Sequence, residues 1–228
     1  MRTIFRSRFL AEQCTTAPFS LSSHLCVYAT LHTDSMFTLR KPSVEDIRQF
    51  MLRQDTQHFS YPFVGVTQVT PPVGYDVDHN HIRLGTGRDT FERAKAALRH
   101  WEMFNLGWVQ LHWPDASIIV NSTVAVIAHV WGLWITNACR IVYVREEMGP
   151  VETFGFAYGT LPAHVERGEE RFLVQWDHRD DSVWYNLLAI SQPHHILARV
   201  GYLYVRHLQK CFARDSLRAM QRAVSQAF

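Results

Sequence analysis

The chain has 228 residues, of which 47% are hydrophobic and 19% are charged, and this composition excludes a mainly disordered protein. The formal net charge of +2 is too small to indicate nucleic-acid binding by itself. No apolar run reaches the ~18–20 residues of a membrane-spanning helix. The length fits one domain, or one domain with an appendage.

Residues 1–35 differ in composition from the rest of the chain. They contain three arginines and only two acidic residues, a balance typical of organelle transit peptides. The other interpretation is that Met36 is the true start and that the preceding residues are an upstream extension. We predict a poorly ordered extension over 1–35, a single domain over 36–228, and a cytoplasmic protein, or an organellar one if the extension is a transit peptide.

The cysteines form no pattern of a metal site or of a dense disulfide framework. They are Cys14, Cys26, Cys139 and Cys211, far apart and without a C-x-x-C pair. We therefore predict reduced thiols, as in cytoplasmic proteins. His79 and His81 would share one face of a strand, but no third ligand is identifiable, so we predict no metal site and no cofactor.

The first part of the predicted domain contains two helices and one strand. The capping box Ser43–Asp46 predicts a short helix to about Arg53. Alternating residues predict a strand over 75–83, and apolar residues at helical spacing predict a helix over 89–104. The turn between them, Gly85-Thr86-Gly87, lacks the third glycine of a dinucleotide-binding loop, so we interpret it as a backbone turn.

From Trp108 onward the pattern is that of β-strands. The predicted strands are 108–113, 122–130, 135–146, 151–161, 171–177 and 182–191. Their short connections require antiparallel pairing, and Pro193 is expected to open a final helix that runs to about Ala223. The sequence thus predicts an α+β fold in which a curved antiparallel sheet of about seven strands wraps around a long C-terminal helix. This order resembles the helix-grip fold of the START and birch-pollen-allergen-like superfamily, which implies a cavity between sheet and helix.

The final helix has two faces of opposite character. An apolar row contains Tyr204, Leu208, Phe212, Met220 and Val224. A basic row, two positions out of phase, contains Arg206, Lys210, Arg214, Arg218 and Arg222. Because two residues rotate a helix by about 200°, we expect the apolar row to enter the sheet, with Phe212 nearly fully buried, and the basic row to face water. The basic row is either a solvated face or a docking surface for an anionic partner.

Several stretches carry a resemblance to a known family. They include Phe59-Ser60-Tyr61-Pro62, Leu84-Gly85-Thr86-Gly87, Arg140 to Val144, Phe154-Gly155-Phe156-Ala157-Tyr158-Gly159-Thr160-Leu161-Pro162 and Gly168 to Phe172. Together they resemble the family of the domain of unknown function 1990, an uncharacterised protein family, from about Met36 to the C-terminus. This resemblance implies the helix-grip fold and gives no mechanism.

The second half of the long motif Phe154 to Pro162 and the residues after it carry most of the polar chemistry. Tyr158 and Thr160 share one face of a strand. The turn predicted after them carries His164, Glu166, Glu169 and Glu170. Near a cavity mouth, a histidine and carboxylates can act as general acid and base. The alternative is a solvated turn, with Glu170 and Arg171 as ordinary charges at a strand edge.

Arg140 begins a predicted strand of mostly apolar residues. A buried arginine needs a partner, because an unpaired internal charge is very costly. The candidate partners are Glu170 and an anionic group of a ligand. The alternative is a structural ion pair elsewhere or an exposed strand end.

Three functions remain open. The first is a binding module that holds an apolar or amphipathic small molecule in the cavity. The second is an enzyme of the same fold that uses acid–base residues near Tyr158 and Glu170. The third is a basic-surface interaction protein without a ligand. The predicted ligand-binding residues are Trp101, Arg140, Tyr143, Tyr158, Thr160, His164, Glu170, Tyr185 and Ser191.

Overall fold

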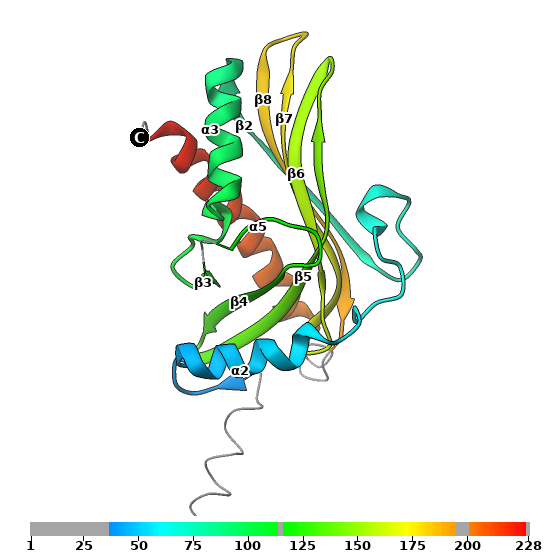
Figure 1. Ribbon diagram of the computed structural model, residues 1–228, viewed down its shortest axis with the longest axis vertical. Coiled ribbons are helices and arrows are strands. Elements are labelled where there is room, and N and C mark those ends of the chain that lie inside the picture. The colour runs from blue at the N-terminus through cyan, green and yellow to red at the C-terminus, as the bar shows by residue number, and fades with distance from the viewer. Residues whose placement is uncertain (1–36, 114–115, 195–200, 227–228) are drawn as a thin grey trace, which may run out of the picture.

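The computed structural model describes residues 37–113, 116–194 and 201–226 (Figure 1). The predicted extension over 1–35 lies outside the described residues. The helices within them are α2 (Val44–Asp55), α3 (Gly87–Arg99) and α5 (Tyr202–Ser225), with 3-10 turns at Val66–Gln68 and Glu102–Phe104. The strands are β1 (Phe37–Thr38), β2 (Asp76–Thr86), β3 (Val109–His112), β4 (Thr123–Val130), β5 (Leu133–Glu147), β6 (Val151–Thr160), β7 (Glu166–Asp177) and β8 (Ser182–Pro193).

All of these strands belong to one antiparallel sheet. Their order is β2-β8-β7-β6-β5-β4-β3, and the short β1 pairs with β5. Figure 1 shows the long strands curving so that the concave side of the sheet faces α5. The prediction of a curved antiparallel sheet around a C-terminal helix, the helix-grip arrangement, is therefore confirmed.

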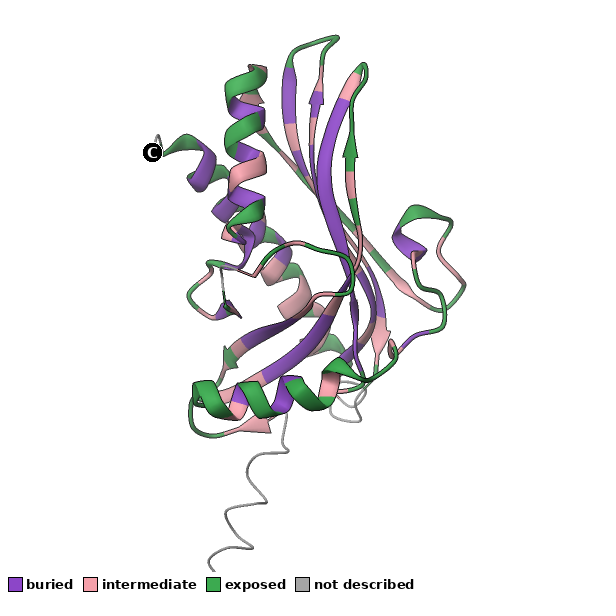
Figure 2. Ribbon diagram, in the orientation of Figure 1, coloured by how far each residue is buried: buried purple, intermediate pink, exposed green. Residues whose placement is uncertain are grey.

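Side-chain alternation assigns each strand residue to the concave or the convex face. Along β2, Asp78 and Asn80 point to the concave side, whereas His79 and His81 are exposed. Nearly all of β6 is buried, as Figure 2 shows in purple. It is buried on both sides because α3 packs on the concave face and the segment 59–69 packs on the convex face.

A buried carboxylate holds the segment 59–69 against the convex face. A Cβ at Gly159 would lie 2.1 Å from the Tyr61 hydroxyl oxygen, so a glycine is required at this close approach. The Tyr61 hydroxyl donates to Glu169 at 2.8 Å, and the backbone N–H groups of Gly65 and Thr67 donate to the same carboxylate at 2.7 and 3.1 Å. Glu169 is therefore a structural residue of a strand, and its assignment to a turn is wrong.

The half of the concave face beneath α3 is filled by aromatic side chains. Trp101, Phe156 and Phe172 are at most 2% exposed. The Trp101 and Phe156 ring centroids lie 4.8 Å apart, and those of Phe156 and Phe172 lie 5.3 Å apart. The C-terminal part of α5 adds the buried residues Met220 and Val224 to this core. Burial stabilises the fold by roughly 25 cal/mol for each Å² of apolar surface removed from water.

The helix predicted over 89–104 ends at Arg99, and the starts of β7 and of the last helix also differ from the prediction. Strand β7 begins at Glu166, so the predicted turn after β6 ends earlier and Glu166 belongs to the sheet. A Cβ at Gly168 would lie 2.0 Å from the Ile190 carbonyl oxygen, so this glycine permits close pairing of β7 with β8. Pro193 ends β8 and does not open the last helix, whose described part begins at Tyr202.

The apolar row of α5 is buried only in its C-terminal half. Met220 and Val224 are buried, whereas Tyr204, Leu208 and Phe212 are half-buried. The prediction that Phe212 is nearly fully buried is therefore wrong, because its ring lies beside a cavity.

The basic row of α5 faces water at four of its five positions. Lys210, Arg214, Arg218 and Arg222 are exposed, as predicted. Arg206 is the exception, since its side chain is only 18% exposed and pairs with Asp78 of β2. Across the described residues, no helix is both long and apolar enough to span a membrane.

Candidate ligand-binding cavity

A cavity of about 510 Å³ lies between the concave face of the sheet and the N-terminal half of α5. Its volume falls within the range of roughly 300–1,000 Å³ that is common for small-molecule sites. The aromatic residues on its wall are Phe37, Phe104, Trp108, Trp131, Tyr158, Tyr204 and Phe212. Aliphatic residues such as Val126, Leu187 and Leu208 line the wall between these aromatic residues. The wall is therefore mainly apolar.

An aromatic pair forms one edge of the cavity. Trp131 lies in the tight turn between β4 and β5, with φ at 51°, and is 86% exposed. Its ring stacks on Tyr204 of α5, with the two ring centroids 4.4 Å apart. Both residues line the cavity, so the cavity meets the protein surface at this pair.

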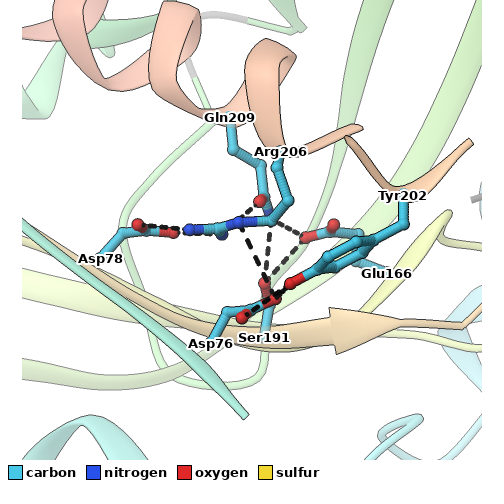
Figure 3. Close-up of polar contacts among 7 residues, drawn as sticks. All are labelled: Asp76, Asp78, Glu166, Ser191, Tyr202, Arg206 and Gln209. Atoms are coloured by element: carbon cyan, nitrogen blue, oxygen red, sulfur yellow. Dashed lines mark hydrogen bonds and ion pairs between the residues drawn. The ribbon is translucent and has the colours of Figure 1, made fainter. Parts of the chain in front are cut away.

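Polar side chains from β7, β8 and α5 meet on one part of the wall (Figure 3). The Ser191 hydroxyl donates to Glu166 Oε2 at 2.8 Å. The Gln209 amide donates to the same carboxylate oxygen and, at 3.0 Å, to Ser191 Oγ. Burial raises the pKa of Glu166, although these hydrogen bonds act in the opposite direction. The cluster ties α5 to the two strands.

Arg206 connects α5 to the edge strand β2 beside this cluster (Figure 3). Its guanidinium donates to the Asp78 carboxylate at 2.5 and 2.7 Å and to Gln209 Oε1 at 2.5 Å. Asp76 lies 3.9 Å from the same guanidinium and accepts a hydrogen bond from the Tyr202 hydroxyl at 3.0 Å. Arg206 is therefore bonded within the protein, and the prediction that it belongs to a solvent-facing docking row is wrong.

Glu170 and Tyr158 face each other on the neighbouring strands β7 and β6. The Tyr158 hydroxyl donates to Glu170 Oε2 at 2.6 Å. Burial raises the pKa of Glu170 to about 7; the Tyr158 hydrogen bond acts against this rise, and the charges of Glu166 and Asp78 add to it. Burial also raises the pKa of Tyr158 well above its usual value. Near neutral pH, Tyr158 is a neutral donor and Glu170 can take up or release a proton.

His164 and Thr160 complete the polar part of the wall. The backbone N–H of Glu166 donates to His164 Nδ1 at 3.0 Å. Burial lowers the pKa of His164 to about 4, so its ring is neutral at neutral pH. Thr160 Oγ1 accepts from the Gly168 N–H at 2.9 Å and lies 2.6 Å from Ser60 Oγ. Both residues therefore present polar but uncharged groups.

Five of the nine predicted ligand-binding residues lie on the cavity wall. They are Tyr158, Thr160, His164, Glu170 and Ser191. Trp101 and Tyr185 instead belong to the filled half of the sheet. The Trp101 indole N–H donates to the Ala116 carbonyl at 2.8 Å, and the Tyr185 hydroxyl lies 3.0 Å from Ser216 Oγ.

Arg140 lies on the convex face, and its predicted pairing with Glu170 is wrong. Its guanidinium donates to the backbone carbonyls of Gln54, Asp55 and Gln57 at 3.2, 2.7 and 2.8 Å. These carbonyls belong to the end of α2 and the residues after it, where helix carbonyls lack partners within the helix. Arg140 therefore fastens α2 to the sheet.

Tyr143 is the ninth predicted residue, and it also points away from the cavity. Its hydroxyl lies 2.7 Å from Thr67 Oγ1 in the segment 59–69. The pairing of β5 with β6 shifts between Ile141 and Tyr143, and such a bulge reverses the alternation of side chains after it.

Asp78, Arg206 and Gln209 are parts of the polar network that the sequence analysis did not assign to the cavity. The alternation along β2 could have indicated Asp78, because every second residue from Asp76 points inward. The sequence contains no signal for its pairing with Arg206, which lies 128 positions away along the chain.

Solved structures with a similar chain path have little sequence in common with this protein. The crystal structure of Ara h 8.0201 gives a TM-score of 0.42 at 9% identity, covering 67% of this chain and 100% of that one. The crystal structure of human STARD10 gives a TM-score of 0.40 at 10% identity, covering 81% of this chain and 80% of that one.

Sequence comparison gives a closer relationship. A UPF0548 protein of Dictyostelium discoideum is 36% identical over 208 residues, which cover 83% of this chain and 96% of that protein. The family model described as a domain of unknown function, DUF1990, matches residues 60–219. The matched range includes every strand from β2 to β8 and most of α5. The chain therefore belongs to the DUF1990 family.

Proposed function

We propose that the protein binds an apolar or amphipathic small molecule in the cavity between the sheet and α5. The observation that supports this proposal is a hollow of about 510 Å³ with a mainly apolar wall. A molecule that fills it gains roughly 25 cal/mol for each Å² of apolar surface that leaves water. Cavities left empty inside a protein are destabilising, so a hollow of this size is better explained by an occupant.

The polar residues of the wall would orient this molecule. Tyr158, Thr160, His164, Glu170 and Ser191 lie on one wall of an otherwise apolar space. A few polar groups in an apolar pocket fix the orientation of a ligand and supply specificity. We assign these five residues to contacts with the polar part of the ligand.

Native mass spectrometry of the protein purified from its own host tests the proposal. We expect a retained small molecule that is released when the protein unfolds. Ala189→Phe should abolish this retention, because Ala189 lines the cavity on β8 and the added ring would occupy the space.

Val77→Phe is the matched control for this change. Val77 is 50% exposed, and its neighbour Asp78 pairs with Ala189 across β2 and β8. The same ring is thus added at nearly the same position along the sheet but outside the cavity. Equal retention by both variants would contradict the cavity as the site.

A second candidate function is acid–base catalysis on the bound molecule. It is favoured by the 2.6 Å hydrogen bond between Tyr158 and Glu170 within the cavity and by the pKa of Glu170 of about 7. A group with a pKa near the working pH is suited to general acid–base catalysis. Catalysis predicts that wild type and Glu170→Gln release chemically different molecules. Release of the same molecule by both would contradict it.

The exposed basic residues of α5 support contact with an anionic partner as a separate proposal. Lys210 and Arg218 are exposed and lie two helical turns apart. Retention on immobilised heparin, a polyanion, tests the proposal. Lys210→Gln with Arg218→Gln should lower the salt concentration needed for elution, and unchanged elution would contradict the proposal.

We also propose a cytoplasmic location. Cys139 and Cys211 are free thiols, which fits a reducing compartment. Fluorescence microscopy of the tagged full chain in its host would reveal an organellar location if the proposal is wrong.

A further inference from the structure

Of the Asp, Glu, Lys and Arg side chains, the described part of the cavity wall contains only acidic ones. Among the described residues that line the cavity, the acidic ones are Asp78, Glu166, Glu169 and Glu170, and none is lysine or arginine. The Glu169 carboxylate is turned to the convex side, and Asp78 is paired with Arg206. Of the two acidic residues that face the cavity, Glu166 is near the positive charge of Arg206, whereas Glu170 has no basic partner among the described residues.

One carboxylate oxygen of Glu170 has no hydrogen-bond donor among the described residues. The Tyr158 hydroxyl bonds to Oε2, and within the described part of the chain no donor bonds to Oε1. Glu166 Oε1 likewise has no donor among the described residues, but two groups, Ser191 and Gln209, donate to its Oε2, and the positive charge of Arg206 acts on this carboxylate. An unpaired buried carboxylate is costly. A positively charged group from outside the chain would remove that cost at Glu170.

Aromatic rings surround this part of the cavity. The Phe104 ring centroid lies 6.2 Å from that of Tyr158 and 5.4 Å from that of Phe212. Trp108 lines the same space. The faces of such rings attract cations, whereas an anion would meet the carboxylates in a setting of low dielectric constant, where repulsion is strong. We therefore expect the cavity wall to favour a cationic ligand over an anionic one.

We propose that the ligand is an amphipathic organic cation whose ammonium group donates a hydrogen bond to Glu170 Oε1 and whose apolar body lies along the aromatic and aliphatic wall. This inference rests on the proposed function that the cavity binds a small molecule. A metal ion fits less well, because Ca²⁺ takes about 6–8 oxygen ligands, whereas Glu170 and Glu166 each offer one carboxylate oxygen without a donor among the described residues.

Three probes with the same ten-carbon chain test the inference on the full-length protein. They are decylammonium chloride, decan-1-ol and sodium decanoate, and isothermal titration calorimetry at neutral pH measures their dissociation constants. Charge-assisted hydrogen bonds are stronger than neutral ones. We therefore expect decylammonium to bind about tenfold more tightly than decan-1-ol, or better, and decanoate to bind most weakly.

Glu170→Gln tests the assignment of the carboxylate. The variant keeps the shape of the side chain, and its carbonyl oxygen can still accept from Tyr158. We expect decylammonium to lose about tenfold in affinity and decan-1-ol to keep its affinity. Glu147→Gln is the control, because it removes the same charge from an exposed residue at the end of β5 and should change neither affinity.

The outcomes separate this inference from the proposed function. If wild type binds decan-1-ol or decanoate as tightly as decylammonium, or more tightly, the inference that the ligand is a cation is wrong, and the proposal of an apolar binding site in the cavity remains. Failure of all three probes to bind would overturn both. The wild-type comparison needs no variant, so the inference can be refuted even if Glu170→Gln does not fold.

Discussion

The two halves of the space between sheet and helices are built on the same strands but are filled differently. Along β6, the inward residue Phe156 packs in the core beneath α3, and two residues later Tyr158 lines the cavity beneath α5. Helix α3 supplies a second layer of side chains over the half that contains Phe156. Over the half that contains Tyr158, side chains of α5 such as Tyr204, Leu208 and Phe212 are only half-buried and line the cavity. Stability is therefore expected to depend on the filled half and ligand binding on the hollow half.

The largest expected loss of stability lies in the filled half. Phe156→Ala should lower the free energy of unfolding by about 3–5 kcal/mol, through lost transfer energy and a new cavity. Phe156 is 0% exposed and touches the rings of Trp101 and Phe172. Urea denaturation measures the loss. A loss below about 1 kcal/mol would mean that the core beneath α3 is not packed as described.

The free energy of unfolding should depend on pH because of Glu170, which lines the cavity. Burial raises its folded pKa from 4.5 to about 7, so the folded chain holds this proton more tightly than the unfolded chain. The stability that results is fully present below pH 4.5 and is lost as the pH rises through about 7. The loss is on the order of 3 kcal/mol across this range, before any reduction by solvent in the cavity.

His164 acts in the opposite direction, so the effect must be isolated with a variant. Its folded pKa is lowered from 6.5 to about 4, and the stability that it contributes is lost as the pH falls through that range. The difference in unfolding free energy between wild type and Glu170→Gln removes this shared effect. That difference should increase as the pH falls from 7 to 4.5. A difference independent of pH would contradict the burial of Glu170.

The network that closes the hollow half is expected to matter less than the aromatic core. Arg206→Met should cost about 1–3 kcal/mol, because it leaves the Asp78 carboxylate without its partner. Adding Asp78→Asn should recover part of this loss. Arg218→Met, at an exposed position of the same helix, is the control. Strict additivity of the Arg206 and Asp78 changes would contradict their pairing.

Local patterns were enough to predict most of the fold. Alternating and helical periods located the strands from β3 to β8 and the final helix, and short connections required antiparallel pairing. The errors occurred where a long-range contact overrides a local signal. Gly168 is a turn residue by type, but the close approach of Ile190 makes it a strand residue.

The site was predicted less completely than the fold, for the same reason. Tyr158, Thr160 and Glu170 were found because they lie in or shortly after a specific motif and carry polar groups. Tyr143 was misplaced by a bulge that the sequence does not signal. In the sequence, Arg206 belongs to the basic row of its helix. Its pairing with Asp78 becomes evident only in the folded chain.

The smallest expected effects test how open the hollow half is. Phe212 lies beside an existing cavity, so Phe212→Ala should enlarge that cavity and cost only about 1–2 kcal/mol, less than Phe156→Ala. Arg214, two residues later, is 54% exposed and bonds to its neighbour Asp215 on the same helix. Arg214→Ala should therefore change stability by less than about 0.5 kcal/mol.

Urea denaturation of both single variants measures these effects, and calorimetry with decylammonium adds the ligand. Phe212→Ala should also weaken decylammonium binding, because it removes an aromatic wall, whereas Arg214→Ala should leave binding unchanged. A loss of stability in Phe212→Ala as large as in Phe156→Ala would mean that α5 closes onto the sheet in solution. The two halves would then be packed alike, and the cavity would be too small for the proposed ligand.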